Sequence, residues 1–477
     1  MKVLMMVDNA IVGDSRVQKT AKSVSDLGHE VLLLGRDLGI PELPNNMGNV
    51  EIVRVPVAVP ITDFRMVHPR KSIGSIFGYQ GSDQCDKAKA KIELRKYSIK
   101  TRSEVGTSTV IPKALERLMT AIFAFRRAQY ARAWKIQNSK IGLVNRARGF
   151  LFNLTRNSVH LFRISPTLYE YESAFLPVAI NFQPDVVHAH DFRLAGAGVR
   201  MADALSASGK RPKVIYDAHE FLEGISGFTP ADTFAFLLNE KVAAKSSDRI
   251  ITVSQDIAEL LTNKYSLSQQ PAVVLNAPTT TSAKTCKRKI RIDCGISESL
   301  PLGVYLGVLS AKRGISPVLE AMESIPELHF AFVANVNAYN TVFLEEAEKR
   351  GLANRVHLLP YVSPSEIVEY VADASFGLAP YLHDVNHEVS LPSKFYEYAI
   401  AQLPIVGSDV RVVKKTIEKY GIGEVFTAGD PRTLSEAMSR VINNQKSYVG
   451  KYSQAPVSSW TWEAQEAALN VVYESLR

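Results

Sequence analysis

Two histidines stand at the ends of neighbouring apolar runs in the first half of the chain. Residues 185–190 end in His190 and residues 214–219 end in His219, and an acidic residue follows each of them. If the two runs are adjacent parallel strands, both imidazoles lie at one edge of the sheet and can bond a ligand. A structural role for each histidine remains the alternative. No cysteine or third histidine has zinc-ligand spacing, so we expect no metal site.

A polar loop at residues 9–16 follows the first apolar run. Gly13 lets the backbone approach a ligand closely, because glycine carries no side chain. Asp14 and Arg16 are candidates for hydrogen bonds with an acceptor substrate. Two plainer interpretations stay open, with Asp14 as the N-cap of the following helix and Arg16 as a solvated charge.

In the second half, residues 305–314 place a glycine and two cations between an apolar run and a helix. The residues are Gly307, Lys312 and Arg313. Backbone amides at such a turn, together with the planar donors of a guanidinium, form a site for a diphosphate. The alternative is a surface loop with solvated charges.

The most closely spaced candidate functional residues of the chain lie within residues 390–407. Ser393 suits the start of a helix, which puts Lys394 in the first turn and Glu397 one turn later. A lysine at a helix N-terminus opposes the macrodipole, so its placement favours a bound anion. Glu397 can accept hydrogen bonds from two ribose hydroxyls. Alternatively, Lys394 and Glu397 form a simple pair at i, i+3.

The elements that position these residues follow one alternating pattern. Short apolar runs, typical of buried parallel strands, alternate with helical segments from residue 2 to 276 and again from residue 302. The pattern predicts two doubly wound α/β halves joined around residues 277–300. In open α/β sheets, ligands bind at the carboxyl ends of the strands, where all the candidate residues stand.

Length and composition set the class of protein. The chain has 477 residues, 46% of them apolar and 22% charged, which implies two to four domains and excludes global disorder. Three cysteines cannot form a disulfide framework, so a reducing compartment is favoured. The first apolar run is too short for a signal peptide, and no stretch approaches the ~18 apolar residues of a spanning helix. We therefore expect a cytoplasmic protein.

The positive charge is concentrated in one segment. Residues 65–165 hold 21 Lys and Arg against 5 Asp and Glu, whereas the other 376 residues have a net charge of −8. Within it, Leu115, Met119, Ile122 and Phe125 stand among arginines at helical spacing. This pattern favours an anionic membrane surface as partner. No recognised motif supports nucleic-acid binding, and a solvated decoration is the alternative.

The ordered set of motifs resembles glycosyltransferase family 4, whose members are retaining, nucleotide-sugar-dependent enzymes of the GT-B fold. The resemblance covers about residues 1–65 and 170–477. The segments that carry it are residues 14–21, 28–31, 185–191, 216–220, 248–254, 275–276, 307–314, 391–404 and 459–463.

The resemblance implies two facing Rossmann-like domains. The acceptor-side domain would span residues 1–280 with the basic, largely helical insertion at 65–165. The nucleotide-sugar-binding domain would span 301–455, and a C-terminal helix at 456–477 would cross back to the first domain.

The resemblance also implies residue roles. Arg313 would neutralise the β-phosphate of the donor, Glu397 would bind ribose, and His219 would lie near the point of sugar transfer. The expected donor-binding residues are Gly13, Gly307, Lys312, Arg313, Ser393, Lys394 and Glu397, the catalytic ones His219, Arg313 and Lys394, and the acceptor-side ones Asp14, Arg16 and His190.

The sequence departs from the family at two points. Val308 occupies a place where the family often has arginine, so Lys312 or Lys394 would supply the second cation. The family's two glutamates, eight residues apart, would put the first at Val389, whereas this chain has Glu388. The role of Glu388 is therefore open.

The resemblance implies transfer of a sugar, with retention, from a nucleoside diphosphate sugar to an acceptor hydroxyl. The setting would be bacterial cell-surface polysaccharide or glycolipid synthesis, with a lipid-linked or polysaccharide acceptor. The enzyme would need no metal or other cofactor and would attach peripherally to the inner face of the plasma membrane. The alternatives are a same-fold sugar-nucleotide epimerase or phosphorylase, and a non-catalytic polysaccharide- or lipid-binding protein.

Overall fold

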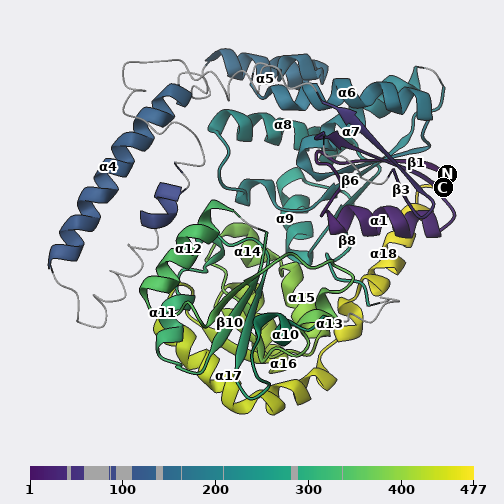
Figure 1. The fold of residues 1–477 in the computed structure, drawn as a ribbon. Helices are drawn as coiled ribbons and strands as arrows, with labels where there is room; N and C mark the ends of the chain where they lie inside the picture. Colours follow the sequence, from purple (N-terminus) through teal and green to yellow (C-terminus); the bar gives the residue numbers. More distant parts are fainter. Residues whose placement is uncertain are drawn as a thin grey trace. The chain divides into compact units, whose positions relative to one another are not determined.

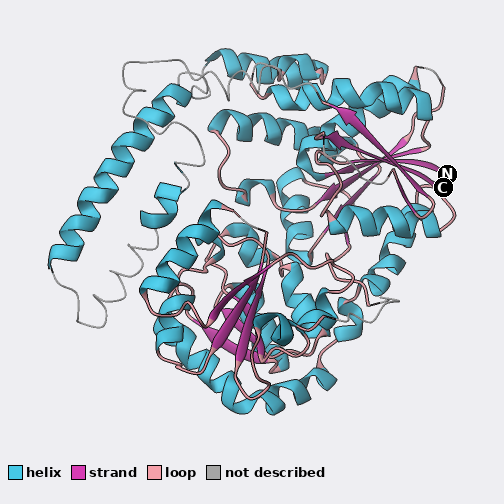
Figure 2. Cartoon of the chain, viewed as in Figure 1, coloured by secondary structure: helices cyan, strands magenta, loops and turns pink. Residues whose placement is uncertain are grey.

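The computed structural model describes residues 1–39, 45–57, 85, 87–92, 110–135, 143–162, 164–207, 209–280, 288–335 and 337–477. Contacts within the chain divide it into two compact units, whose elements are labelled in Figure 1. The first unit comprises Met1–Arg70, Trp134–Asn276 and Trp462–Arg477, and the second comprises Lys71–Ala133 and Ala277–Thr461. Each unit contains one sheet surrounded by helices, as Figure 2 shows.

The described strands of the first unit form one sheet in the order β3-β4-β2-β1-β5-β6-β7-β8. All neighbours pair in parallel except β3 and β4. The strands are β1 (Lys2–Met6), β2 (Glu30–Asp37), β3 (Asn46–Met47), β4 (Val50–Pro56), β5 (Val186–His190), β6 (Lys213–Ala218), β7 (Arg249–Thr252) and β8 (Ala272–Val273). Helices therefore connect most of the parallel neighbours, as the alternating pattern predicts.

Helices cover both faces of this sheet, because a strand directs alternate side chains to opposite faces. Val3 and Met5 pack with α1 and α18, whereas Leu4 and Met6 pack with α6 and α7. The described helices are α1 (Ser15–Asp26), α5 (Leu143–Thr155), α6 (Pro166–Phe182), α7 (Asp191–Ser206), α8 (Pro230–Ser246), α9 (Gln255–Tyr265) and α18 (Trp462–Glu474), with 3₁₀ turns η2 (Ser158–His160) and η3 (Leu222–Gly224).

The described strands of the second unit form a wholly parallel sheet in the order β11-β10-β9-β12-β13-β14. They are β9 (Leu302–Leu306), β10 (His329–Val333), β11 (Val356–Leu359), β12 (Phe376–Ala379), β13 (Ile405–Ser408) and β14 (Gly423–Phe426). Gly377 is required in β12, since a Cβ there would lie 2.3 Å from the Tyr398 ring. Tyr398 belongs to the helix that carries Lys394 and Glu397, so this close packing seats that helix on the sheet.

Contacts group most of α4 (Val110–Lys135) with the second unit. The other described helices of this unit connect and cover the sheet, and they are α10 (Ile290–Cys294), α11 (Val318–Glu323), α12 (Ala338–Lys349), α13 (Ile367–Val371), α14 (Val385–Val389), α15 (Ser393–Ile400), α16 (Arg411–Tyr420) and α17 (Pro431–Lys451), with 3₁₀ turns η4 (Ala311–Arg313), η5 (Tyr452–Gln454) and η6 (Val457–Trp460). The last residues of α4 fall in the first unit by contacts. Among the described residues, no helix has the length and hydropathy needed to cross a membrane.

The basic segment at residues 65–165 is divided between the two units. Ala90 is buried in the core of the second unit, and the Lys91 ammonium lies 3.4 Å from a carboxylate oxygen of Glu345 on α12. By contrast, α5 packs in the first unit, where Gly149 contacts Phe234 of α8. Contacts thus group residues 71–133 with the second unit, whereas the sequence places the whole segment in the first domain.

Candidate active site

The loop after β1 positions the first candidates. Gly13 has φ +77° and open space where a Cβ would be, which leaves its backbone accessible. Asp14 caps α1, since its side chain accepts from the Val17 amide at 3.2 Å and from the Asn9 amide group at 2.8 Å. The capping interpretation of Asp14 is therefore confirmed, and contact with an acceptor stays a prediction.

Arg16 has a different environment from the expected one. Its side chain is 3% exposed, and Nε and Nη2 donate to the two carboxylate oxygens of Asp217 at 2.9 and 2.7 Å. Nη1 donates to the carbonyl of Val274 at 2.8 Å. The guanidinium is thus used inside the protein and is not presented to an acceptor. It fixes a carboxylate at the end of β6 that the sequence analysis did not single out.

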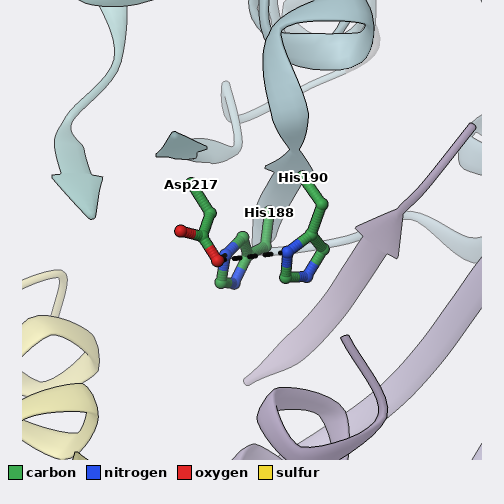
Figure 3. A group of neighbouring side chains, drawn as sticks. All are labelled: His188, His190 and Asp217. Carbon is green, nitrogen blue, oxygen red and sulfur yellow. Dashed lines mark ion pairs between the residues drawn. The ribbon is translucent and has the colours of Figure 1, made fainter. Parts of the chain in front are cut away.

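Asp217 is the centre of this cluster. Oδ2 of Asp217 lies 3.2 Å from Nδ1 of His190, 3.5 Å from Nε2 of His219 and 3.9 Å from Nε2 of His188. Figure 3 shows His188 and His190 extending from the same strand toward this carboxylate. The structure therefore brings His190 and His219 together, with their nearest ring nitrogens 3.3 Å apart.

The charges in the cluster are balanced by contact. Burial alone would raise the pKa of Asp217, but Arg16, His219 and two imidazole hydrogen bonds outweigh it and hold that pKa well below its usual range. Burial lowers the pKa of His190 despite the opposing effect of Asp217. For His219, burial is outweighed by the charge and hydrogen bond of Asp217, which raise its pKa.

His188, His190 and Asp217 also form a group of potential metal-binding atoms, all within 4.8 Å of one another. His188 was not among the residues expected from the sequence, although alternation along a strand places residues i and i+2 on one face. Arg16 argues against a cation here, because its guanidinium already neutralises both oxygens of Asp217. We therefore treat the cluster as a hydrogen-bond network and retain the expectation of no metal.

In the second unit, two glycines shape the loop that carries Lys312 and Arg313: Gly307 follows β9, and Gly314 follows η4. Gly307 has φ +105°, and Gly314 has φ +73°. A Cβ at Gly314 would lie 1.6 Å from the carbonyl oxygen of Pro380, so only glycine fits. The loop is therefore held against the chain that follows β12.

Lys394 lies beside this loop and is buried, with 9% of its surface exposed. Its Nζ lies 3.8 Å from the centre of the Tyr305 ring and 5.2 Å from that of Tyr381. No hydrogen bond or ion pair joins this ammonium to any residue in the described part of the chain. Burial first, and then the charge of Arg313, lowers the pKa of Lys394 well below its usual range. The alternative interpretation, an ion pair with Glu397 at i, i+3, is not seen, and the charge of Glu397 only partly opposes the lowering of the pKa of Lys394.

Helix α15 adds unsatisfied donors next to Lys394. Its N-cap residue is Pro392, which makes no side-chain hydrogen bond to the first turn. The first backbone N–H groups of a helix point outward without an intrahelical partner and attract anions. Ser393 is half-buried in this turn, and Glu397 is half-buried one turn later. An anion at this helix end would meet both the amides and the Lys394 ammonium.

Arg313 is exposed at the end of η4, as is Lys312. The Arg313 guanidinium lies 5.7 Å from the centre of the Tyr381 ring. Burial raises the pKa of Tyr381 to about 12, although Arg313 opposes the rise. The Tyr381 ring thus lies beside both Arg313 and Lys394, and the Tyr305 ring lies beside Lys394. Neither tyrosine was expected at the site from the sequence.

The carboxylate of Glu388 contacts His383 and the first residue of α16. Oε1 of Glu388 lies 2.5 Å from Nδ1 of His383, and Oε2 accepts from the Arg411 amide at 2.7 Å. His383 in turn lies 3.2 Å from Asp409 through Nε2. These contacts place Glu388 at the start of α16, where a carboxylate suits the helix dipole.

Comparison with known proteins identifies both halves of the chain. The family model "Glycosyltransferase Family 4" matches residues 119–281, and the model "Glycosyl transferases group 1" matches residues 287–455. No curated protein matches the sequence.

Solved structures share the fold over the whole length. Sucrose-phosphate synthase from Thermosynechococcus elongatus has a TM-score of 0.65 at 12% identity, covering 100% of this chain and 99% of that one. HepE from Anabaena, in complex with UDP-glucose, has a TM-score of 0.62 at 12% identity and full coverage of both chains. WaaG, a glycosyltransferase involved in lipopolysaccharide biosynthesis, has a TM-score of 0.55 at 14% identity, covering 98% and 99%.

Two glycosyltransferase models thus match in chain order on two Rossmann-like units, and the fold agrees with that of solved glycosyltransferases. The chain is a glycosyltransferase of the α/β GT-B fold that resembles glycosyltransferase family 4.

Proposed function

We propose that the enzyme moves a sugar, with retention, from a nucleoside diphosphate sugar to an acceptor hydroxyl. The observation that carries this proposal is the buried Lys394 ammonium, which has no anionic partner among the described residues and stands at an uncapped helix N-terminus. A buried charge without a partner is costly, and a diphosphate would remove that cost.

Charge develops on the leaving diphosphate as the bond to the sugar breaks. Lys394, Arg313 and the first amides of α15 would stabilise this charge without a divalent metal, because fixed donors need no reorganisation. Val308 stands where the family often has arginine, so one cation is missing there. Lys394 would supply it, since the Lys394 ammonium lies 3.6 Å from where a Cβ of Gly307 would be. Glu397 would accept from the ribose hydroxyls. We favour departure of the diphosphate on the face that the acceptor attacks, with the diphosphate as base.

The first unit would provide the acceptor side and the point of sugar transfer. Nε2 of His190 is buried and has no hydrogen-bond partner among the described residues. Because Nδ1 of His190 faces Asp217, the ring can keep its lone pair on Nε2 and accept from a substrate hydroxyl. His219, raised in pKa by Asp217, would donate instead. Gly13 and Asp14 would border the same edge of the sheet.

The nature of the nucleotide follows from the solved neighbours only as a proposal. HepE binds UDP and UDP-glucose, and starch synthase IV from Arabidopsis thaliana binds ADP. We therefore expect UDP or ADP to raise the unfolding temperature more than GDP or TDP. Thermal-shift measurements with each nucleotide and its sugars distinguish the four, since stabilisation grows with concentration relative to Kd.

Arg313→Ala and Glu397→Ala test the site. We expect both variants to lose transfer while keeping the wild-type circular dichroism, because each removes a donor-binding group at the surface of the second unit. Arg432→Ala, another exposed residue of that unit, is the matched control and should retain activity. Full turnover in both site variants would refute the assignment, and nucleotide binding without turnover in the wild type would indicate a binding protein. Transfer undiminished by EDTA is expected.

A lipid-linked or polysaccharide acceptor at a membrane surface accounts for the basic segment. WaaG and the lipopolysaccharide outer core galactosyltransferase WaaB share the fold, which supports a role in cell-surface polysaccharide or glycolipid synthesis. Residues 117–169 contain ten Lys and Arg and no Asp or Glu. The exposed apolar residues of the helices in this segment are Leu115, Leu118, Ile122 and Phe125 on α4 and Val144, Phe150, Leu151 and Leu154 on α5.

Helix α5 presents apolar side chains on two opposite faces. Phe152 is fully buried on the face that packs against the first unit, whereas Phe150 and Leu154 are 65% and 71% exposed. Exposed apolar side chains beside cations fit the surface of an anionic bilayer. We therefore assign the peripheral membrane contact to α4 and the outer face of α5.

Co-sedimentation with phosphatidylcholine vesicles, with and without phosphatidylglycerol, tests this assignment. We expect salt-sensitive binding to the anionic vesicles alone, weakened several-fold by Ile122→Glu and by Leu154→Glu. Val471→Glu changes an exposed apolar residue outside the basic segment and should bind like the wild type. Equal binding to both kinds of vesicle, or no binding, would remove the membrane from the proposal.

A further inference from the structure

The C-terminal helix contributes a side chain to the histidine cluster of the first unit. Tyr473 on α18 is fully buried, and its hydroxyl lies 2.8 Å from Nδ1 of His188. Its ring stacks on His29, with centres 5.6 Å apart. This is the one hydrogen bond that the Tyr473 hydroxyl makes within the described residues. A hydrogen bond from the end of the chain thus reaches the edge where His190 and His219 lie.

The position of the proton on His188 follows from its neighbours. Nε2 of His188 faces Oδ2 of Asp217 at 3.9 Å and has no hydrogen-bond partner in the part of the chain that the structure describes. If the proton is on Nε2, the N–H points toward the carboxylate and Nδ1 accepts from Tyr473. If it is on Nδ1, a lone pair faces the carboxylate and the tyrosine O–H has no acceptor. The first arrangement satisfies more buried groups and is favoured.

His188 in turn supports His190. The two rings stack with centres 4.3 Å apart and an interplanar angle of 18°, on one face of β5. Both rings are fully buried, so neither can swing toward solvent without opening the sheet edge. The orientation of His190 therefore depends on a ring whose own tautomer and plane are fixed by Tyr473.

We propose that Tyr473 and His188 are positioning residues for sugar transfer, because they fix the ring of His190, whose buried Nε2 has no hydrogen-bond partner among the described residues. The inference rests on the proposed function, because His190 acts only if it meets a substrate hydroxyl. It assigns to α18 a part in the reaction besides packing. Besides each other, these rings feel the charges of Asp217, Arg16 and His219, and His190 also feels that of Asp14.

The test compares two conservative variants on one helix. Tyr473→Phe removes the hydroxyl and keeps the packing, whereas Trp462→Phe removes the indole bond to Ser23 at 2.8 Å and leaves the histidine cluster untouched. We expect kcat to fall on the order of tenfold in Tyr473→Phe with the donor KM unchanged, the scale of one buried hydrogen bond. Trp462→Phe should lower the unfolding temperature and keep kcat.

A spectroscopic measurement separates this inference from the proposed function. In ¹⁵N-histidine-labelled wild type we expect His188 to be protonated on Nε2, and its Nδ1 resonance to shift in Tyr473→Phe. Protonation on Nδ1, a kcat of Tyr473→Phe within twofold of the wild type, or equal losses of kcat in both variants would overturn the inference. If the wild type transfers no sugar, the proposed function fails, and the resonance of His188 still decides the arrangement of Tyr473.

Discussion

At the carboxyl edge of the first unit's sheet, the buried carboxylate of Asp217 accepts two hydrogen bonds from Arg16 and faces three imidazoles. At the corresponding edge in the second unit, the buried ammonium of Lys394 lies beside two tyrosine rings and near the cation Arg313, and no hydrogen bond or ion pair joins it to an acceptor among the described residues. Both edges bury charge, yet only the first balances it within the protein. This difference indicates that Asp217 stabilises the fold, whereas Lys394 is placed to bind an anionic ligand.

Because Lys394 destabilises the empty site, its replacement should separate activity from stability. Lys394→Met should lower kcat/KM by about 10²–10³-fold, as the loss of one fixed transition-state contact does. The same variant should unfold at the wild-type temperature or above, since a poorly solvated charge has been removed. Steady-state kinetics and thermal unfolding check this prediction.

Lys414→Met, which alters an exposed lysine of α16, is the control and should change neither quantity. A clear loss of stability in Lys394→Met would contradict the comparison, because it would mean that the ammonium is already paired within the protein.

In the first unit, replacing the buried charged residue Asp217 should lower stability, whereas replacing Lys394 in the second unit should not. Asp217→Asn leaves the Arg16 guanidinium buried without its partner, which should destabilise the protein by about 3–5 kcal/mol at neutral pH. The pKa of Asp217 is lowered on folding, so its contribution is present above the unfolded pKa of about 4 and is lost as the pH falls below it. Urea unfolding at several pH values measures both effects.

The difference in the free energy of unfolding between the wild type and Asp217→Asn should therefore become smaller at acid pH. A gap that stays constant from neutral pH down to about pH 3 would show that the carboxylate is not the stabilising group. Asp203→Asn, which removes an exposed partner of Arg211, should cost little at any pH.

Of these substitutions, replacement of Glu388 should have the smallest effect on activity. Its carboxylate is held by His383 and the Arg411 amide and does not approach Lys394. We expect Glu388→Gln to change kcat/KM for the donor less than about threefold, because a glutamine oxygen can still accept from the amide. Kinetics with saturating acceptor measure it. A loss comparable to that of Glu397→Ala would assign Glu388 to the donor site after all.

Much of the fold could be predicted from local pattern. Continuous apolar runs predicted the strands that end at His190, His219 and Gly307, and the structure has β5, β6 and β9 there. The glycine at 314 and the helix start at Ser393 were also apparent, because both depend on local backbone geometry. The chemistry of single side chains was less predictable. Arg16 was expected at the acceptor, yet its guanidinium forms a buried ion pair with Asp217, and Asp14 caps a helix, which was the plainer of its two interpretations.

Periodicity and glycine placement act over a few residues, so they were enough to predict the two α/β halves, the order of their elements and the edges at which polar residues gather. The matching of charges, by contrast, depends on tertiary contacts. Arg16 meets Asp217 across 201 positions and Tyr473 meets His188 across 285, while Lys394 meets rings from two other segments and forms no ion pair with a carboxylate among the described residues. Whether a buried charge is satisfied depends on every group within a few ångströms, and that set is fixed by packing between segments far apart in the chain.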